Sequence, residues 1–344
     1  MNEQTHLSAW RVPKDAFPKR GTHAEQFKFL VNYALLAPSI HNSQPWRFRV
    51  TGEALELFAD RKRSLRVVDP DGRALAISCG AALFNLRTAM YYFGCVGEAR
   101  PFPDPRQPDL LARVTLDPSK LHPGGWTELF NAIPVRCTNR GPFEPREAPP
   151  ALEAALRDAA RLEGAWLALF KSARVKKAVA LLIAEGDRIQ FSNPRFRREL
   201  AQWLHSARDK DGVPGYAKGV NELLDFTAPA IAYLVRTFDV GNGVAARDSD
   251  LATGSPLLAC LGTARDDPLA WLNAGEALQR VLLVATAHGF DASFLNQPIE
   301  VPALRPKLGG LSAHKYYPQV LLRIGRGVPA KHTPRRPIED ILIY

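Results

Sequence analysis

The sequence predicts an α+β protein in which one chain contains two related halves. A helical pattern followed by an alternating, strand-like pattern occupies residues 23–50, and the same order of elements returns from residue 126 onward. The length of 344 residues also suggests two units at the usual size of about 150 residues per domain. We therefore expect a lead-in at 1–22, a first half at 23–125 and a second half at 126–344.

The composition indicates a soluble, cytoplasmic protein with a sizeable core, since 46% of the residues are hydrophobic. The segment Met1–Gly21 is polar and contains Pro13 and Pro18, so no secretory signal is expected. The longest apolar runs, Ala178–Ala184 and Ala228–Val235, are well short of the roughly 18 residues that a membrane span needs.

The net charge of +10 is spread over several separate clusters and is not accompanied by a nucleic-acid motif. We interpret most of these charges as solvated faces and expect no nucleic-acid partner. The cysteines are far apart and form neither a redox nor a zinc motif, so reduced, buried thiols and no metal are expected. They are Cys79, Cys95, Cys137 and Cys260.

In the first half, apolar residues recur at helical spacing through 27–37, and Pro38 favours an end of that helix. Residues 46–50 alternate apolar and basic side chains, and a turn at 51–53 leads to a second alternating run, which predicts a hairpin. The turn residues at 69–72 precede a helix of about four turns that Gly94 caps. A strand at Leu110–Leu116 and a break at 118–125 complete this half.

The second half begins with a short helix through Leu129 and Ile133, followed by a basic segment at 136–140. Helices are predicted at 151–162, 175–184 and 196–207, strands at 166–170, 256–262 and 320–324, a loop at 209–216, and a helix that ends at Gly289. The tail covers 325–344.

A constant offset relates the two halves. Residues Gly80, Ala82, Leu83 and Gly94 coincide with Gly275, Ala277, Leu278 and Gly289 when the first half is moved along the chain, and Asp71 coincides with Asp266. Because amphipathic helices resemble each other readily, the matches gain weight mainly from the shared order of elements. Together they predict a duplication.

The sequence APSIHNSQPW at 37–46 connects the first helix to the first strand and places amides and a hydroxyl between two prolines. An ordinary turn and a ligand-binding loop are both consistent with it. The run resembles the flavin-contacting segment of the nitroreductase family of FMN proteins, and most closely that of the Acg-type proteins, whose chains contain two fused nitroreductase-like halves. The resemblance implies that this loop contacts FMN, through Pro38, Ser39, Asn42 and Gln44.

Two basic segments resemble the phosphate-binding elements of that family. The first contains Arg136, Thr138 and Arg140, and the second contains Arg335 and Arg336 before a proline. Arginine offers forked donors to phosphate oxygens, and a threonine hydroxyl adds a neutral hydrogen bond. An exposed basic turn would also explain the first segment, and in the second Arg335 is preferred to Arg336.

The resemblance implies one composite FMN site for each chain. The polar loop occurs in the first half only, whereas the arginine-threonine-arginine element occurs in the second half only. A monomer that acts as a pseudo-dimer is therefore expected. Residues 290–298 resemble the loop along the reactive edge of the flavin, where Ser293 and Asn296 either contact the cofactor or act as helix-cap or turn residues.

The expected function is that of an oxidoreductase which moves hydride from NADH or NADPH through FMN to a nitroaromatic, a quinone or a similar small acceptor. No protein group is expected to be catalytic, because the chemistry belongs to the flavin. The alternative is a non-catalytic protein that binds or stores FMN. Residues 209–219 resemble the lid of the Acg-type proteins, although a plain surface loop fits equally well.

A glycine pattern at 241–246 satisfies the loose dinucleotide-binding motif and follows the apolar run 228–235. Residues 247–256 are judged a poor helix, so the strand-turn-helix context of a Rossmann site is not expected.

Overall fold

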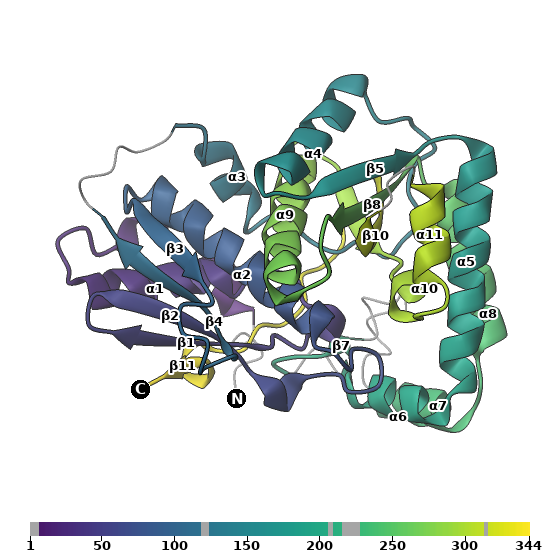
Figure 1. The fold of residues 1–344 in the computed structure, drawn as a ribbon, viewed down its shortest axis with the longest axis horizontal. Coiled ribbons are helices and arrows are strands. Elements are labelled where there is room, and N and C mark those ends of the chain that lie inside the picture. The colour runs from purple at the N-terminus through teal and green to yellow at the C-terminus, as the bar shows by residue number, and fades with distance from the viewer. Residues whose placement is uncertain (1–6, 118–123, 206–208, 215–227, 313–315) are drawn as a thin grey trace.

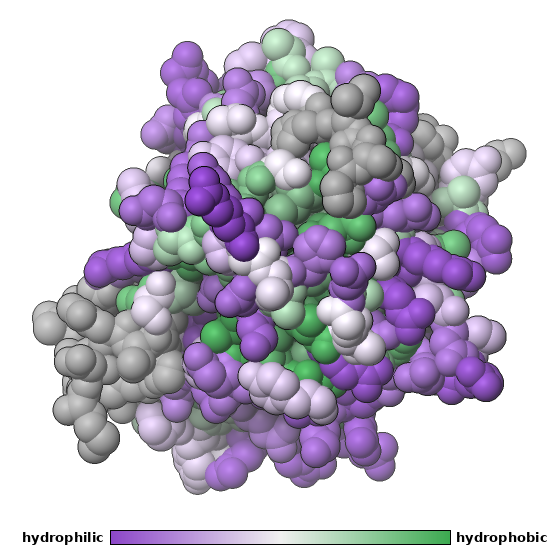
Figure 2. Space-filling view, turned by 90° about the vertical axis from the view of Figure 1, so that its left-hand side faces the viewer, coloured by the Kyte–Doolittle hydropathy of each residue, from purple (hydrophilic) through white to green (hydrophobic). Residues whose placement is uncertain are grey.

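The computed structural model describes residues 7–117, 124–205, 209–214, 228–312 and 316–344. Two sheets lie on either side of a pair of long helices, α2 (Arg73–Tyr92) and α9 (Pro268–Ala287), which cross near the centre of the molecule (Figure 1). The outer face next to the first sheet carries hydrophilic side chains around smaller apolar areas (Figure 2).

The first sheet has the strand order β11-β1-β2-β4-β3. Its strands are β1 (Trp46–Thr51), β2 (Ala54–Ala59), β3 (Gly97–Pro101), β4 (Leu110–Leu116) and β11 (Leu342–Ile343). The apolar core that contains buried residues of this sheet also contains residues of helices α1 (His23–Ala34), α2 and α3 (Thr127–Ala132). The C-terminal β11 pairs in parallel with β1, so the tail closes the edge of the first sheet.

The predicted hairpin is confirmed, because β1 and β2 pair antiparallel around a turn in which Gly52 has a φ of 57°. The alternation along β1 buries Trp46 and Phe48. On β2 the carboxylate of Glu56 is also buried, and Arg49 and Arg113 each donate two hydrogen bonds to it. These bonds compensate the loss of hydration.

The second sheet has the order β5-β8-β10-β9. Its strands are β5 (Trp166–Phe170), β8 (Leu257–Thr263), β9 (Asp291–Phe294) and β10 (Tyr317–Gly325). The helices in the same stretch of the chain are α4 (Pro150–Leu162), α5 (Ala173–Ser192), α6 (Pro194–Gln202), α7 (Ala228–Thr237), α8 (Gly241–Gly254), α9, α10 (Gln297–Glu300) and α11 (Arg305–Leu311). Two short strands, β6 (Leu204–His205) and β7 (Val213–Pro214), pair with each other.

The predicted duplication is visible at the crossing of α2 and α9. The offset that carries Gly80 onto Gly275 also carries both ends of α2 onto the ends of α9. A Cβ on Gly80 would lie 2.1 Å from the carbonyl oxygen of Leu272, and one on Gly275 would lie 2.1 Å from that of Ile77. Ile77 and Leu272 are related by the same offset. The two helices thus contact each other through equivalent positions, as in an isologous contact about a pseudo-two-fold axis. Glycine at both positions permits this close approach.

Several expected elements have different bounds. Helices α2 and α5 are longer than predicted, and α6 ends at Gln202 where a helix to residue 207 was expected, because the chain then enters β6. Strands β3 and β11 were not predicted. Residues 206–207, 215–219 and 118–123 of the predicted elements lie outside the described residues.

The prediction that residues 247–256 are a poor helix is wrong, since Gly241–Gly254 forms α8. The glycine pattern lies inside that helix, and the preceding apolar run forms helix α7 in place of a strand. The strand-turn-helix context of a dinucleotide site is therefore absent here. The division of the chain at residue 125 stays a prediction.

Among the described residues, no helix is both long and apolar enough to cross a membrane. The cysteines are all free thiols; Cys79 and Cys260 are buried, whereas Cys95 and Cys137 are partly exposed.

Candidate functional site

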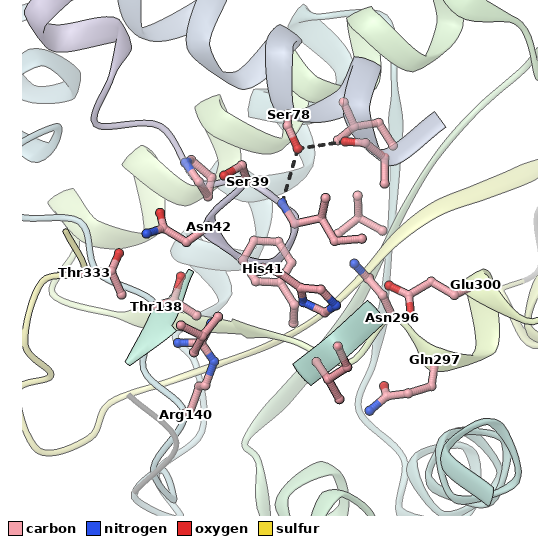
Figure 3. A pocket seen from close by; sticks show the side chains of 18 of the residues that line it. Ser39, His41, Asn42, Ser78, Thr138, Arg140, Asn296, Gln297, Glu300 and Thr333 are labelled. Atoms are coloured by element: carbon pink, nitrogen blue, oxygen red, sulfur yellow. Dashed lines mark hydrogen bonds between the residues drawn. The ribbon is translucent and has the colours of Figure 1, made fainter. Parts of the chain in front are cut away.

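A cavity of about 270 Å³ lies between the two halves. The first half contributes residues 38–42 and the start of α2, and the second half contributes 136–140, α5, α8, α10 and the tail at 332–335. Ligand pockets usually measure about 300–1,000 Å³, so this cavity is close to that range. Figure 3 shows Ser39 and Asn42 on one side of it, Thr138 and Arg140 on another, and Asn296 and Glu300 opposite these two.

The loop between Pro38 and Trp46 has an unusual backbone. His41, Asn42 and Gln44 have positive φ angles of 49°, 55° and 49°. They are three of only four such non-glycine residues in the described part of the chain. This conformation is disfavoured for L-residues and persists where its surroundings impose it, often at a functional site. The Ser39 hydroxyl helps to impose it by accepting a hydrogen bond from Gln44 N at 2.9 Å.

The amides of this loop bind protein groups on two other segments. Asn42 Nδ2 donates to the carbonyl oxygens of Gly212 and Pro334, each at 3.0 Å. Gln44 Nε2 donates to Lys210 O at 2.9 Å. Pro38, Ser39 and Asn42 line the cavity, whereas Gln44 is fully buried outside the lining. The loop thus anchors residues 210–212 as well as the tail.

Arg136 is the clearest candidate for anion binding. It lines the cavity, only 4% of it is exposed, and its Nε has no hydrogen-bond partner among the described residues. Burial is the main cause that lowers the pKa of this guanidinium, and Cys137 and Asp291 oppose the shift only in part. A buried cation without a carboxylate beside it is unfavourable unless an anion binds it.

The other members of the basic end lie around Arg136. Thr138 and Arg140 line the cavity, and Thr138 forms an isolated bridge with Ala292 at the start of β9. His332 also lines it, and burial, with Arg136 and Arg335 nearby, lowers the pKa of its imidazole to about 4. The histidine is therefore neutral at pH 7, and the positive charge here belongs to arginines.

The two adjacent arginines of the tail have different positions. Arg335 lines the cavity, donates to Asn42 Oδ1 at 3.0 Å and to Thr333 Oγ1 at 2.7 Å, and lies 4.6 Å above the Trp10 ring. Arg336 lies outside the lining, and donates to Gln44 O and Asp340 O. The cavity therefore favours the first choice, Arg335, although its role in binding stays a prediction.

Ser293 is placed less favourably for contact with a ligand. It is 3% exposed on β9, opposite Arg323 on β10, and does not line the cavity. Its neighbour Phe294 does, together with Ile77, Leu278 and Val320, so part of the cavity lining is apolar.

The far end of the cavity is acidic, and no pattern in the sequence indicated it. Its polar residues are Asp187 and Gln190 on α5, Asp248 on α8, and Gln297 and Glu300 on α10. Burial, and secondarily the charge of Asp248, raises the pKa of Asp187 to about 7. These side chains come from three helices that are far apart along the chain and form no motif, so only the folded chain brings them together.

A second cavity, of about 360 Å³, lies at the pseudo-symmetric position. Its lining includes Leu83 and Asn273, which the offset between the halves relates to Leu278 and Ser78 of the first cavity. Its arginine, Arg87, is paired with the carboxylates of Glu163 and Glu276. The two cavities share a scaffold but differ in charge.

Comparison with known proteins identifies relatives that match most of the chain. No family model matches the chain. It is 33% identical over 93% of its length to "Putative NAD(P)H nitroreductase Rv3131" of Mycobacterium tuberculosis, of which 91% is covered. It is 30% identical over 91% of its length to "Putative NAD(P)H nitroreductase acg" of the same organism, of which 94% is covered.

Solved structures align with part of the chain. One is the FMN- and NADPH-dependent nitroreductase NfnB from sphigopyxis sp. strain HMH, at 17% identity and a TM-score of 0.41, covering 63% of this chain and 98% of that one. Another is the FMN-dependent nitroreductase NfnB from Mycobacterium smegmatis in complex with NADPH, at 15% identity and a TM-score of 0.40, covering 63% and 97%.

The fold is that of an internally duplicated α+β protein with a cavity between its halves. On the strength of its curated relatives, the chain belongs to the nitroreductase family, in the group that includes the Acg protein. The predicted fold class and family are thereby confirmed.

Proposed function

We propose that this chain binds one FMN in the cavity between its halves and moves hydride from NAD(P)H to a nitroaromatic, a quinone or a similar small acceptor. The observation that carries the proposal is Arg136, a buried guanidinium that lines the cavity without a carboxylate partner among the described residues. The names of the curated relatives support the reaction class.

The residues of the cavity fit such a cofactor. Arg136, Thr138 and Arg140 would hold the phosphate, because guanidinium groups and a hydroxyl are suitable donors for its oxygens. The apolar part of the lining, with Ile77, Leu278, Phe294 and Val320, would pack against the ring system and exclude water from it. The bound flavin would supply the hydride chemistry.

The strained loop at 38–42 has a positioning role in this proposal. Ile40 N donates to Ser78 Oγ at 3.3 Å, which ties the loop to α2 (Figure 3). The Asn42 carboxamide is held by three partners, including Arg335. A loop held in this way presents its backbone to a ligand with little entropy left to lose.

One flavin for each chain follows from the difference between the two cavities. In the second cavity the charge of Arg87 is already balanced by Glu163 and Glu276, so little attraction for a phosphate remains. A monomer would then act as a pseudo-dimer with one active cavity.

Storage of FMN without catalysis is the second candidate, and one observation favours it. Residues 210–212 are fastened to the loop at 42–44 by the bonds of Asn42 and Gln44. Arg63 also joins the two segments, because it donates to Ser43 O and forms an ion pair with Asp211. A segment held so firmly beside the cavity would restrict the entry of a substrate.

Anaerobic reduction separates the two candidates. The purified protein should be yellow, and NADH or NADPH should bleach its flavin within the time of a catalytic turnover if the chain is a reductase. Flavin that is bound but stays oxidised would support storage. A colourless protein that cannot be reconstituted with FMN would contradict both.

A further inference from the structure

The acidic end of the cavity is built by three helices of the second half. Gln297 Nε2, at the start of α10, donates to Asp187 Oδ1 of α5 at 3.1 Å and to Asp248 Oδ2 of α8 at 2.8 Å. Gly186 permits this approach, because a Cβ there would lie 2.8 Å from Gln297 Cβ and 3.0 Å from its backbone. One amide thus holds two carboxylates beside the same cavity.

Asp187 retains a free acceptor at this place. It lines the cavity and is only 1% exposed, and its Oδ2 has no hydrogen-bond partner among the described residues. The Oε1 atom of Gln297 is likewise buried and unpartnered within the described chain. Two buried acceptors without donors leave room for a ligand that donates hydrogen bonds.

The surrounding cations compensate this group of acids only in part, and burial raises the pKa of Glu300 as it does that of Asp187. Glu300 on α10 adds a third carboxylate, which accepts a hydrogen bond from Gln190 at 2.8 Å. Arg73 at the start of α2 acts on Glu300 only at a distance, since its own bonds go to Gln319. Among the described residues, the other cations that act on these acids are the exposed Arg188, which acts on Asp187, and Arg323, which acts on Asp248.

The acidic end is separate from the proposed phosphate site. Thr138 and Arg140 lie on one side of the cavity, Gln297 and Glu300 lie on the opposite side, and His41 lies between them (Figure 3). A phosphate at the basic end would therefore leave the carboxylates free for another molecule or group.

We propose that this acidic end is a recognition subsite for a protonated nitrogen group, such as an ammonium or an amidinium, on the acceptor that the chain reduces. Without a ligand, burial favours the protonated form of Asp187. A bound cation would favour the carboxylate, and Asp187 Oδ2 and Gln297 Oε1 would then accept the hydrogen bonds that this cation donates. This inference deepens the proposed function and rests on it.

The test uses two nitroaromatics of nearly equal size, 4-nitrobenzylamine, whose amine is protonated, and the neutral 4-nitrobenzyl alcohol. For the full chain loaded with FMN, we expect kcat/KM to favour the amine about tenfold or more, the effect of one charge-assisted hydrogen bond. Asp187→Asn should bring the ratio close to one. Glu185→Gln is the matched control, because Glu185 lies on the same helix but its side chain is 46% exposed. This variant should keep the preference for the amine.

A second readout does not need turnover. Calorimetry with oxidised protein should show that the amine binds more tightly than the alcohol. This difference should be lost in Asp187→Asn and reduced in Glu300→Gln. The use of two variants guards against the misfolding of either one. Equal binding of both compounds by the unchanged protein, or a preference that survives Asp187→Asn, would overturn the subsite. A loss of FMN in Asp187→Asn would also overturn it, since the carboxylate would then serve the cofactor.

Failure of the proposed function is distinguishable from these outcomes. Protein that takes up no FMN, or whose flavin NAD(P)H does not reduce, contradicts the reductase proposal whatever the calorimetry shows. Protein that is reduced normally but does not distinguish the two compounds contradicts only the subsite.

Discussion

Replacing Arg136 by methionine is expected to weaken FMN binding and, at the same time, to stabilise the protein without FMN. The guanidinium is 4% exposed and has an Nε without a partner in the described structure, so the FMN-free fold carries the cost of a buried, poorly compensated charge. Methionine fills a similar volume without that cost.

The two effects have opposite signs and similar sizes. Relief of one unsatisfied buried polar group is worth about 1–3 kcal/mol, so the free energy of unfolding of FMN-free protein should rise by about that amount. A hydrogen bond from a charged group to the phosphate contributes about 1.5–3 kcal/mol, and its loss should raise the Kd for FMN about 10- to 100-fold.

The matched control is Arg336→Met. Arg336 is buried to a similar extent, at 5% exposed, and its Nε also lacks a partner among the described residues. Its other nitrogens, however, donate to Gln44 O and Asp340 O outside the cavity, and Nη1 lies 3.7 Å from the Asp60 carboxylate. Because these carbonyls would lose their donor, the free energy of unfolding should fall by about 1–3 kcal/mol.

Urea unfolding of FMN-free protein and titration with FMN, followed by flavin fluorescence, measure the two quantities. One pattern would refute the expectation: Arg136→Met destabilises the protein as Arg336→Met does, while the Kd for FMN stays unchanged. Arg136 would then be a structural residue, and the composite site between the halves would lose its main support.

Three further predictions concern the crossing helices, the acidic end and residues 209–212. Gly80→Ala should lower the free energy of unfolding by about 3 kcal/mol, because its Cβ would clash with the backbone of α9. Gly243→Ala, at an exposed position in a helix, should raise it by about 0.5–1 kcal/mol. Equal effects of the two substitutions in urea unfolding would contradict the close packing of α2 on α9. Because the pKa of Asp187 is raised to about 7, the native state holds a proton that the unfolded state releases near pH 4. Stability relative to Asp187→Asn should therefore fall by on the order of 4 kcal/mol as the pH rises from about 4 to 7, and a pH-independent difference would refute the shift. The hydrogen bond and the charge of Asp211 raise the pKa of His205 above 6.5. Hydrogen-exchange protection of residues 211–213 should therefore be full below pH 6.5 and decline as the pH rises through the raised pKa. Asp211→Asn should remove this pH dependence.

Local sequence patterns were sufficient to predict the bounds of an element where residues that end a helix or strand flank it. Strands β4 and β5 have the predicted bounds, because apolar runs there end at glycine, proline or charged residues. Gly94 and Gly289 were predicted as helix ends, and both have positive φ angles, 77° and 72°. The length of α5 was underestimated, since polar residues in its last turns give no sign of where a helix stops.

Contacts between segments that are far apart along the chain could not be predicted from the sequence. Strand β11 is very short and gains its partner only when the C-terminal tail reaches β1, near the other end of the chain. Arg335 and Arg336 are adjacent and chemically identical, so only the backbone direction decides which one lines the cavity. The acidic end combines three helices, and no spacing along the chain could indicate that one amide joins two of their carboxylates.

The asymmetry of the duplicated chain has a simple physical cause. Both cavities lie beside the same pair of crossing helices, and both contain an arginine, so the scaffold alone does not decide which one binds an anion. Around Arg87 the chain provides Glu163 and Glu276 as counter-ions, whereas around Arg136 the described residues provide no direct carboxylate partner. The proposed cofactor site therefore arises where a counter-ion is missing, and its phosphate would take the place of that counter-ion.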